Sequence, residues 1–302
     1  MRIGSPWAWT KIGNATAMHS SNVRNIELLL WARKGSTLRI GRLSPFELVE
    51  PRTLSEAFAA LKSSDGVRPM SGGTALMLMM KAGVLRPTRL VSLRRLGLDG
   101  VVADAQGDLV IGAMTTLRAL EKSAVVQKGW PVITRTLRTL SNVRVRNVAT
   151  VGGALAHGDP HMDLPPLLSA LGATVTIAST AGQRTSKVED LYAGYLETTL
   201  KPGELIVKVQ VPPLGARKAA YLKCTTRSAD DWPAIGVAVV LDGDRPTIVI
   251  SAATDRPTRI ASAEAADGLQ IEGDLHGSAA YKKHLVRVYV KRAIDEARNS
   301  GR

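Results

Sequence analysis

The order of apolar and polar residues predicts short helices and strands from Pro45 onward. A Thr-Leu-Ser-Glu run at 53–56, followed by apolar residues at helical spacing, is typical of a capped helix start. A strand-like run over 67–70 leads into a Ser-Gly-Gly-Thr turn at 71–74. The segments expected next are an apolar helix over 75–81 and a strand over 90–93. This order predicts a strand–helix–strand unit with a glycine turn at a helix start.

A second block repeats this alternation and contains another glycine pair, in the Thr-Val-Gly-Gly run at 150–153. Its expected elements are strands over 108–112, 173–177 and 204–211 and helices over 116–120, 132–140 and 164–171. The last third differs, because it predicts a three-stranded antiparallel sheet and then one long amphipathic helix. These elements are expected over 219–224, 235–241, 247–252 and 278–297. The mixture of helices and sheets indicates an α+β protein.

The first 42 residues differ from the rest of the chain. They hold three of the five Trp residues and show no sustained helical or strand period. We interpret residues 1–42 as an atypical N-terminal extension, translated upstream of a true start near Leu43. The remaining chain is expected to form a first domain over 43–213, with two lobes over 43–104 and 105–213, and a C-terminal domain over 214–302.

Composition excludes several classes of protein. With 45% apolar and 22% charged residues the chain is expected to fold, and its apolar runs are far shorter than the ~20 residues of a membrane helix. Cys224 is the single cysteine, which excludes an internal disulfide and a Cys-ligated iron–sulfur cluster. The five His residues show no metal-binding spacing. We therefore expect a cytoplasmic protein with no integral membrane span and no metal site, whose redox chemistry would need an organic cofactor.

The net charge of +14 raises the alternative of nucleic acid binding. Residues 1–42 hold seven Lys and Arg against one Glu, and most other basic residues lie among acidic neighbours. The tightest basic cluster has no aromatic residue for base stacking; it comprises Arg86, Arg89, Arg94 and Arg95. The charge therefore favours a basic surface that faces an acidic partner or an anionic cofactor over one that binds nucleic acid.

The two glycine pairs are the strongest chemical signal. Consecutive glycines let backbone N–H groups approach an anion closely, and a following helix N-terminus adds partial positive charge. Neither 71–74 nor 150–153 is a Walker A loop or a GxGxxG fingerprint. Each pair alone is more often a plain turn, but two pairs in similar contexts predict a cradle for a pyrophosphate.

The segments around both pairs resemble the two FAD motifs of the medium subunits of molybdenum hydroxylases, the family of aerobic carbon monoxide dehydrogenases and xanthine dehydrogenases. The first is PMSGGTALMLMMK at 69–81 and the second is RNVATVGGALAHGDPHMDLPP at 146–166. Further matches, at 199–207, at 221–223 with Arg227 and at 278–285, extend the resemblance from about residue 44 to about residue 297. It implies the FAD-binding fold shared with vanillyl-alcohol oxidase and p-cresol methylhydroxylase (PCMH type): two α/β lobes, followed here by the C-terminal α+β domain.

The resemblance also implies which residues contact FAD. They are Pro69, Met70, Ser71, Gly72, Gly73, Thr74, Ala75, Leu76, Leu140, Thr150, Val151, Gly152, Gly153, Ala154, Asp163, Ile206 and Lys223. Backbone N–H groups of both motifs would surround the pyrophosphate, Asp163 would hydrogen-bond the cofactor, and Leu140, Ile206 and Lys223 would line the adenine or flavin. No catalytic residue and no metal ligand is implied.

Some of these positions have a second interpretation. Without the resemblance, Asp163 would equally be a helix cap and Lys223 a solvated strand lysine. His157 and His161 flank the second motif, where a flavin contact and a surface loop are both open. The family usually has polar residues where this chain has Ala75 and Ala154, and each loss removes a hydrogen bond of about 1 kcal/mol.

The resemblance implies a FAD-binding electron-transfer subunit of a molybdenum-dependent hydroxylase or dehydrogenase. It would take electrons from 2Fe–2S clusters of a small partner subunit, and a large partner subunit would hold the molybdopterin, in a dimer of heterotrimers. The electrons would pass to NAD⁺, a quinone or oxygen. Three alternatives stay open: a stand-alone FAD-dependent oxidoreductase of this fold, a basic nucleic-acid-binding protein without FAD, and a degenerate subunit that no longer holds FAD.

Overall fold

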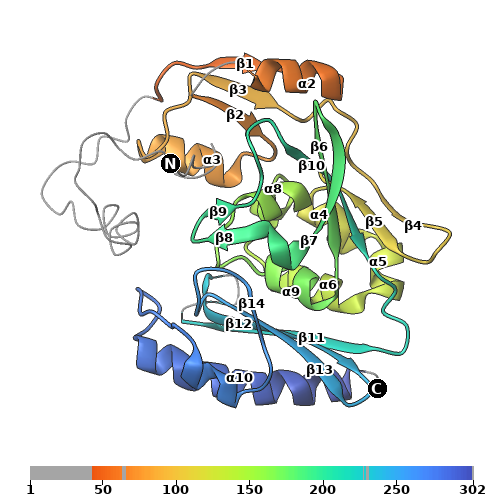
Figure 1. Ribbon diagram of the computed structural model, residues 1–302, viewed down its shortest axis with the longest axis vertical. Coiled ribbons are helices and arrows are strands. Elements are labelled where there is room, and N and C mark those ends of the chain that lie inside the picture. Colours follow the sequence, from red (N-terminus) through yellow and green to blue (C-terminus); the bar gives the residue numbers. More distant parts are fainter. Residues whose placement is uncertain (1–42, 63–65, 227, 229–230, 301–302) are drawn as a thin grey trace, which may run out of the picture.

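The computed structural model describes residues 43–62, 66–226, 228 and 231–300. The N-terminal extension expected over 1–42 and the matching residue Arg227 lie outside the described residues. Figure 1 shows three layers: a small sheet at one end, a larger sheet with most of the helices in the middle, and a third sheet backed by one long helix at the other end.

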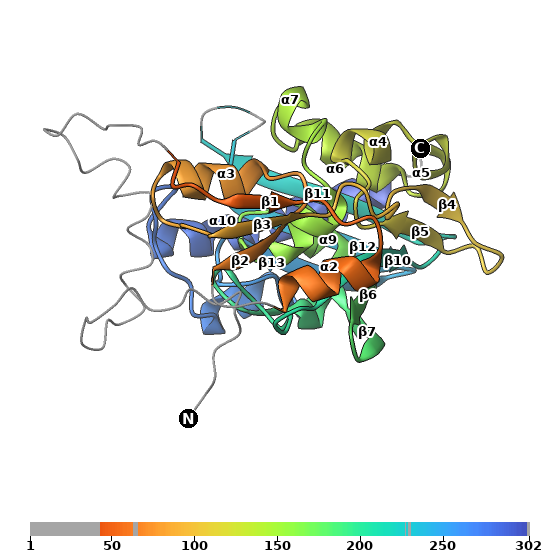
Figure 2. The same cartoon turned by 90° about the horizontal axis from the view of Figure 1, so that it is seen from above.

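The first layer is a parallel three-stranded sheet in the order β1-β3-β2. Its elements are β1 (Glu47–Val49), α2 (Leu54–Leu61), β2 (Val67–Met70), α3 (Thr74–Lys81) and β3 (Arg89–Ser92). Seen from above, α2 and α3 lie on opposite faces of this sheet (Figure 2). The expected cap is present, because Thr53 Oγ1 accepts a hydrogen bond of 3.2 Å from the Glu56 N–H. Both expected strands and both helices of this unit are confirmed.

The middle layer is a five-stranded antiparallel sheet in the order β4-β5-β10-β6-β7. Its strands are β4 (Val101–Ala103), β5 (Leu109–Gly112), β6 (Thr174–Ser179), β7 (Gly182–Lys187) and β10 (Leu205–Val211). The helices packed with it are α4 (Leu117–Lys122), α5 (Ala124–Gly129), α6 (Pro131–Thr139), α7 (Val143–Arg146), α8 (Val151–Ala156) and α9 (Leu164–Ala170). The 3₁₀ helix η2 (Val188–Leu191) and the hairpin β8 (Tyr192–Gly194) and β9 (Glu197–Thr198) precede β10.

The second glycine pair differs from expectation. Gly152 and Gly153 lie inside the first turn of α8 rather than in a turn before a helix. The turn is held by Thr150, whose Oγ1 accepts a hydrogen bond of 3.1 Å from the Gly153 N–H. Two glycines are poor helix formers, so this short helix depends on its cap and on its surroundings.

The C-terminal layer holds one strand more than the sequence predicts. The three expected strands are β11 (Lys218–Thr225), β12 (Pro233–Asp242) and β13 (Arg245–Ser251), and the fourth, β14 (Thr258–Ile260), pairs with β13. Three residues are too few to show an alternating pattern, which is why this strand was missed. The 3₁₀ helix η3 (Glu264–Gly268) and the 21-residue α10 (Ala279–Asn299) complete the layer.

Three buried apolar clusters stabilise the layers. The largest surrounds the middle sheet and includes the completely buried Ile133, Leu155 and Leu167. A second lies between the C-terminal sheet and α10, and a third joins α2 and β3 to the ends of β6 and β10. All seven residues of α9 are buried, because this helix lies between the middle layer and β12 (Figure 1). No helix in the described part of the chain is long and apolar enough to cross a membrane.

Candidate functional site

A cavity of about 470 Å³ opens where the three layers meet. This volume lies within the range of roughly 300–1,000 Å³ typical of ligand and cofactor sites. Its walls come from β2 and α3, from α8 and the loop after it, and from the connection between β11 and β12. Of the 17 residues expected at a FAD site, all except Met70, Val151 and Lys223 line this cavity.

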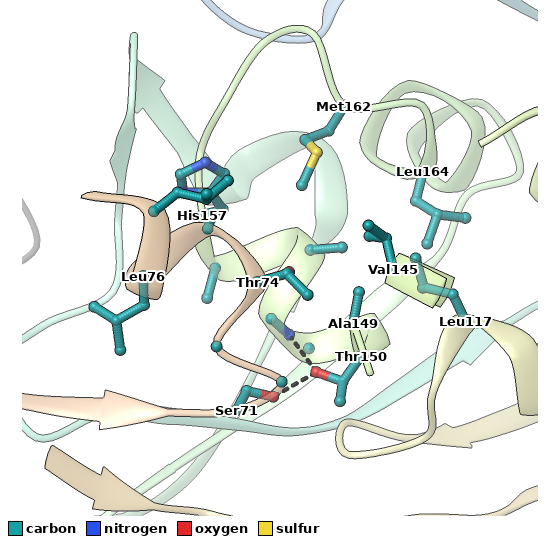
Figure 3. A pocket seen from close by; sticks show the side chains of 18 of the residues that line it. Ser71, Thr74, Leu76, Leu117, Val145, Ala149, Thr150, His157, Met162 and Leu164 are labelled. Atoms are coloured by element: carbon teal, nitrogen blue, oxygen red, sulfur yellow. Dashed lines mark hydrogen bonds between the residues drawn. The ribbon is translucent and has the colours of Figure 1, made fainter. Parts of the chain in front are cut away.

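The first glycine motif forms the N-terminus of α3. Gly73 is the N-cap residue, has a left-handed φ of 72° and offers no side chain to cap the helix. The amides of Thr74, Ala75 and Leu76 have no intrahelical acceptor, and no other described residue accepts a hydrogen bond from them. All three residues line the cavity (Figure 3 shows Thr74 and Leu76), so the start of α3 provides unpaired donors and a positive helix end for an anion.

Three of the four amides in the second motif are already paired within the protein. The amides of Val151, Gly152 and Gly153 already donate to Thr115 O, Ala113 O and Thr150 Oγ1. This differs from the expectation that N–H groups of both motifs are open to a pyrophosphate. Among residues 150–153 only the Thr150 amide has no described acceptor, so the second motif offers fewer unpaired amides at the cavity than the first.

The two motifs touch at the base of the cavity. Ser71 Oγ and Thr150 Oγ1 are hydrogen-bonded, as Figure 3 shows. A Cβ atom added to Gly72 would lie 2.1 Å from the backbone oxygen of Val148, and one added to Gly153 would lie 3.3 Å from Ser71 Cβ. Glycine is therefore required at Gly72 by the close approach of two backbones.

Asp163 lines the cavity, and side chains outside the cavity wall fix the position of its carboxylate. It does not cap α9, since its carboxylate accepts hydrogen bonds from Tyr221 Oη at 2.6 Å and from Lys223 Nζ at 3.2 Å. Burial raises the pKa of Asp163, and the Lys223 ammonium and the Tyr221 hydroxyl offset this only in part. The solvated-lysine interpretation of Lys223 is wrong, because its side chain is only 7% exposed. Lys223 lies behind Asp163 and not in the wall itself.

Arg146 supports another part of the wall. Its buried guanidinium donates to Leu140 O at 2.9 Å and to Ser141 O at 2.5 Å, and it pairs with Glu121 at 3.1 Å. Ser141 has a left-handed φ of 49°, which is unfavourable for a residue other than glycine. Leu140 and Ser141 both line the cavity, so the arginine fixes a strained segment at the site.

Both histidines of the second motif line the cavity. His157 is partly buried, and burial lowers the pKa of its imidazole. His161 is 9% exposed, and although burial opposes its charge, hydrogen bonds to Asp159 and Asp274 raise its pKa to about 9. The surface-loop interpretation is therefore wrong for His161.

Other wall residues were missed by the sequence analysis. Among them are Leu117, Val145, Met162, Leu196 and Trp232. Figure 3 shows Leu117 and Val145 together with Leu164 on the side of the cavity away from Leu76. These apolar residues belong to elements far apart in the chain, and no local motif marks them.

A cleft between sheets, with an anion-binding helix start and mostly apolar walls, is the kind of site that holds a dinucleotide cofactor. Comparison with known proteins identifies the family. Residues 44–214 match the model for the FAD binding domain in molybdopterin dehydrogenase, and the chain belongs to this family.

The relatives are subunits of dehydrogenases. The chain is 29% identical over 274 residues to the glyceraldehyde dehydrogenase medium chain of Sulfolobus acidocaldarius, covering 83% of this chain and 98% of that one. It is 30% identical over 282 residues to the carbon monoxide dehydrogenase medium chain of Afipia carboxidovorans, covering 84% and 96%. Among solved structures, carbon monoxide dehydrogenase from Hydrogenophaga pseudoflava matches with a TM-score of 0.82 at 29% identity, over 86% of this chain and 99% of that one.

These findings confirm the expected PCMH-type α+β fold, FAD as the cofactor, and an oxidoreductase subunit of the carbon monoxide and xanthine dehydrogenase type. The residues at the cavity fit FAD. Unpaired amides face the place where an anion would lie, and the long, mostly apolar walls suit two aromatic ring systems. Ala75 and Ala154 leave two wall positions without a polar side chain, but the backbone donors of the first motif do not depend on either.

Proposed function

We propose that this chain is the FAD-binding medium subunit of a molybdenum-dependent dehydrogenase or hydroxylase. It takes electrons from 2Fe–2S clusters of a partner subunit and passes them to NAD⁺, a quinone or oxygen. The observation that carries the proposal is the start of α3, where the amides of residues 74–76 are unpaired and open into the cavity between the layers. The family match over residues 44–214 supports it.

The residues proposed to hold FAD are those expected from sequence. The amides of Thr74, Ala75 and Leu76 bind the pyrophosphate, while Gly72 and Gly153 allow the two motifs to approach closely enough to enclose it. The remaining contacts are proposed for Pro69, Ser71, Gly73, Leu140, Thr150, Gly152, Ala154, Asp163 and Ile206, which line the cavity. Met70, Val151 and Lys223 do not line it and are proposed to support its wall from behind. Bound FAD supplies two-electron and one-electron redox chemistry, which no side chain of this protein provides.

Asp163 is proposed to hydrogen-bond the cofactor directly. Tyr221 and Lys223 hold its carboxylate at the cavity from the C-terminal sheet, so its orientation is set before the cofactor binds. Lys223 also places a buried positive charge within 3.2 Å of Asp163, which lowers the cost of burying the carboxylate.

The proposed partners are a large molybdopterin-binding subunit and a small iron–sulfur subunit, assembled as a dimer of heterotrimers. Support comes from the relatives, which are medium chains of carbon monoxide dehydrogenase and glyceraldehyde dehydrogenase. The net charge of +14 suits an acidic partner surface. A cytoplasmic location is proposed from the single cysteine, Cys224.

The test is an absorption spectrum of the purified full chain with and without added FAD. We expect flavin bands that a Gly72→Ala/Gly152→Ala double variant loses, because the added Cβ atoms would lie 2.1 Å from Val148 O and 2.7 Å from Ala113 Cβ. A colourless protein that takes up no FAD, with or without its partner subunits, would overturn the proposal. Substrate turnover by the isolated chain would instead favour a stand-alone oxidoreductase.

A further inference from the structure

His161 connects two segments that lie far apart in the sequence. Its Nδ1 lies 2.9 Å from Asp159 Oδ1 in its own loop, and its Nε2 lies 3.2 Å from Asp274 Oδ2, 113 residues further along the chain. Asp274 precedes α10, so the imidazole joins the loop after α8 to the C-terminal layer. An imidazole between two carboxylates donates from both nitrogens when it is protonated.

Lys282 completes a closed loop of hydrogen bonds that includes His161 and Asp274. Its Nζ lies 2.5 Å from Asp274 Oδ2 and donates to Ala252 O at 2.7 Å, while Ala252 N donates to Pro160 O at 2.9 Å. Lys282 is only 1% exposed. The side chains of Asp159, protonated His161, Asp274 and Lys282 together carry no net charge, and pairing of this kind offsets the cost of burying charges.

The same imidazole stacks on a wall residue of the cavity. The rings of His161 and Trp232 have centroids 5.4 Å apart and planes 13° apart, and both residues line the cavity. Trp232 lies in the connection between β11 and β12 and is 41% exposed. A cationic ring on the face of an indole is a favourable contact. The stack places one face of an indole that is still 41% exposed against the His161 imidazole.

We propose that His161 is a positioning residue of the cofactor site: the ion pairs fix its imidazole, and the imidazole holds Trp232 in the cavity wall. This inference rests on the proposed function, because it concerns how the wall is presented to FAD. His161 acts through Trp232, so its loss weakens FAD binding only while the indole is present.

A double-mutant cycle tests this dependence. The variants are His161→Gln, Trp232→Leu and the two combined, and the readout is the Kd of FAD from a flavin fluorescence titration of the full chain. We expect each single variant to raise the Kd roughly three- to ten-fold, as for loss of one aromatic contact. The double variant should bind FAD no more weakly than Trp232→Leu. His284→Gln, an exposed histidine on α10, is the matched control and should leave the Kd unchanged.

A second readout does not depend on FAD. The difference in emission between the wild type and Trp232→Leu isolates the fluorescence of Trp232. In His161→Gln this component should become more accessible to acrylamide, because the stacked ring is gone. If His161→Gln does not fold, Asp274→Asn replaces it in both measurements, since it removes one of the two carboxylates that hold the imidazole.

The outcomes separate this inference from the proposed function. If the wild type binds no FAD, the proposed function fails, and acrylamide quenching still decides whether His161 positions Trp232. If the wild type binds FAD but the double variant loses as much binding free energy as the two single variants together, His161 acts independently of Trp232 and the inference is overturned. Unchanged affinity and unchanged quenching in His161→Gln would overturn it as well.

Discussion

The close approach of the two glycine motifs makes Gly72→Ala the most informative single substitution. A Cβ atom at this position would lie 2.1 Å from Val148 O, 2.8 Å from Val148 C and 3.0 Å from Ala149 Cα. All three atoms belong to the backbone, so no side chain can rotate away. The two motifs must therefore move apart by at least about 1.3 Å to reach an ordinary contact distance of about 3.4 Å or more.

The loss of stability in Gly72→Ala can be worked out from the contacts that this movement disrupts. Overpacking of this kind costs about 1–3 kcal/mol, and loss of the hydrogen bond between Ser71 and Thr150 adds about 1 kcal/mol. We therefore expect the free energy of unfolding to fall by about 2–4 kcal/mol. Displacing the unpaired amides of α3 from the anion should weaken FAD binding about ten- to hundred-fold, as for one or two charge-assisted hydrogen bonds.

Urea unfolding followed by circular dichroism gives the stability of Gly72→Ala, and fluorescence titration gives its Kd for FAD. Gly129→Ala is the matched control, because a Cβ atom at the end of α5 meets nothing within 4 Å. It should unfold and bind FAD like the wild type. If Gly72→Ala also matched the wild type in both measurements, the required contact between the motifs would be refuted.

Three further substitutions or conditions test the walls of the site. Tyr221→Phe removes the hydroxyl that donates to Asp163 at 2.6 Å, so the Kd of FAD should rise about five- to ten-fold with an unchanged circular dichroism spectrum; an unchanged Kd would contradict this. Arg146→Lys loses the paired hydrogen bonds to the strained segment at Ser141, and urea unfolding should show a loss of about 2–4 kcal/mol. The pKa of His161 is raised from 6.5 to about 9, because its protonated form is favoured in the folded protein. The contribution of this protonated imidazole to the free energy of unfolding is therefore complete below about pH 6.5 and is lost as the pH rises through about 9. Urea unfolding between pH 6 and 9.5 should show this decline in the wild type and a smaller one in His161→Gln.

The sequence was sufficient for those parts of the site whose chemistry is local. Gly72 and Gly73 could be recognised because a second glycine pair recurs in a similar context, and the structure places both residues at the cavity. The helix start at Thr53 was predicted from local sequence, since the capping hydroxyl and the amide that donates to it lie three residues apart. Local spacing therefore gave the first motif and most of the element order.

Residues whose partners are distant could not be recognised in this way. Without the family resemblance, Lys223 would be interpreted as a solvated strand lysine, because its partner, Asp163, lies 60 residues earlier in the chain. Trp232 and Val145 became wall residues only when three layers met, and their neighbours in sequence carry no sign of this. The helix α8 was missed because two glycines lower its helix propensity, which the Thr150 cap and contacts to neighbouring elements overcome.

The distribution of backbone strain supports a functional role for this region. Among the described residues, the non-glycine residues with a left-handed φ are Ser141, Leu196 and Ala252. Ser141 and Leu196 line the cavity, and Ala252 joins the loop of His161 to Lys282. Each such residue costs about 1–3 kcal/mol and persists only where its surroundings enforce it. Strain scattered by chance would not collect in this way around one cavity, so the fold holds its unfavourable backbone where the shape of the wall matters most.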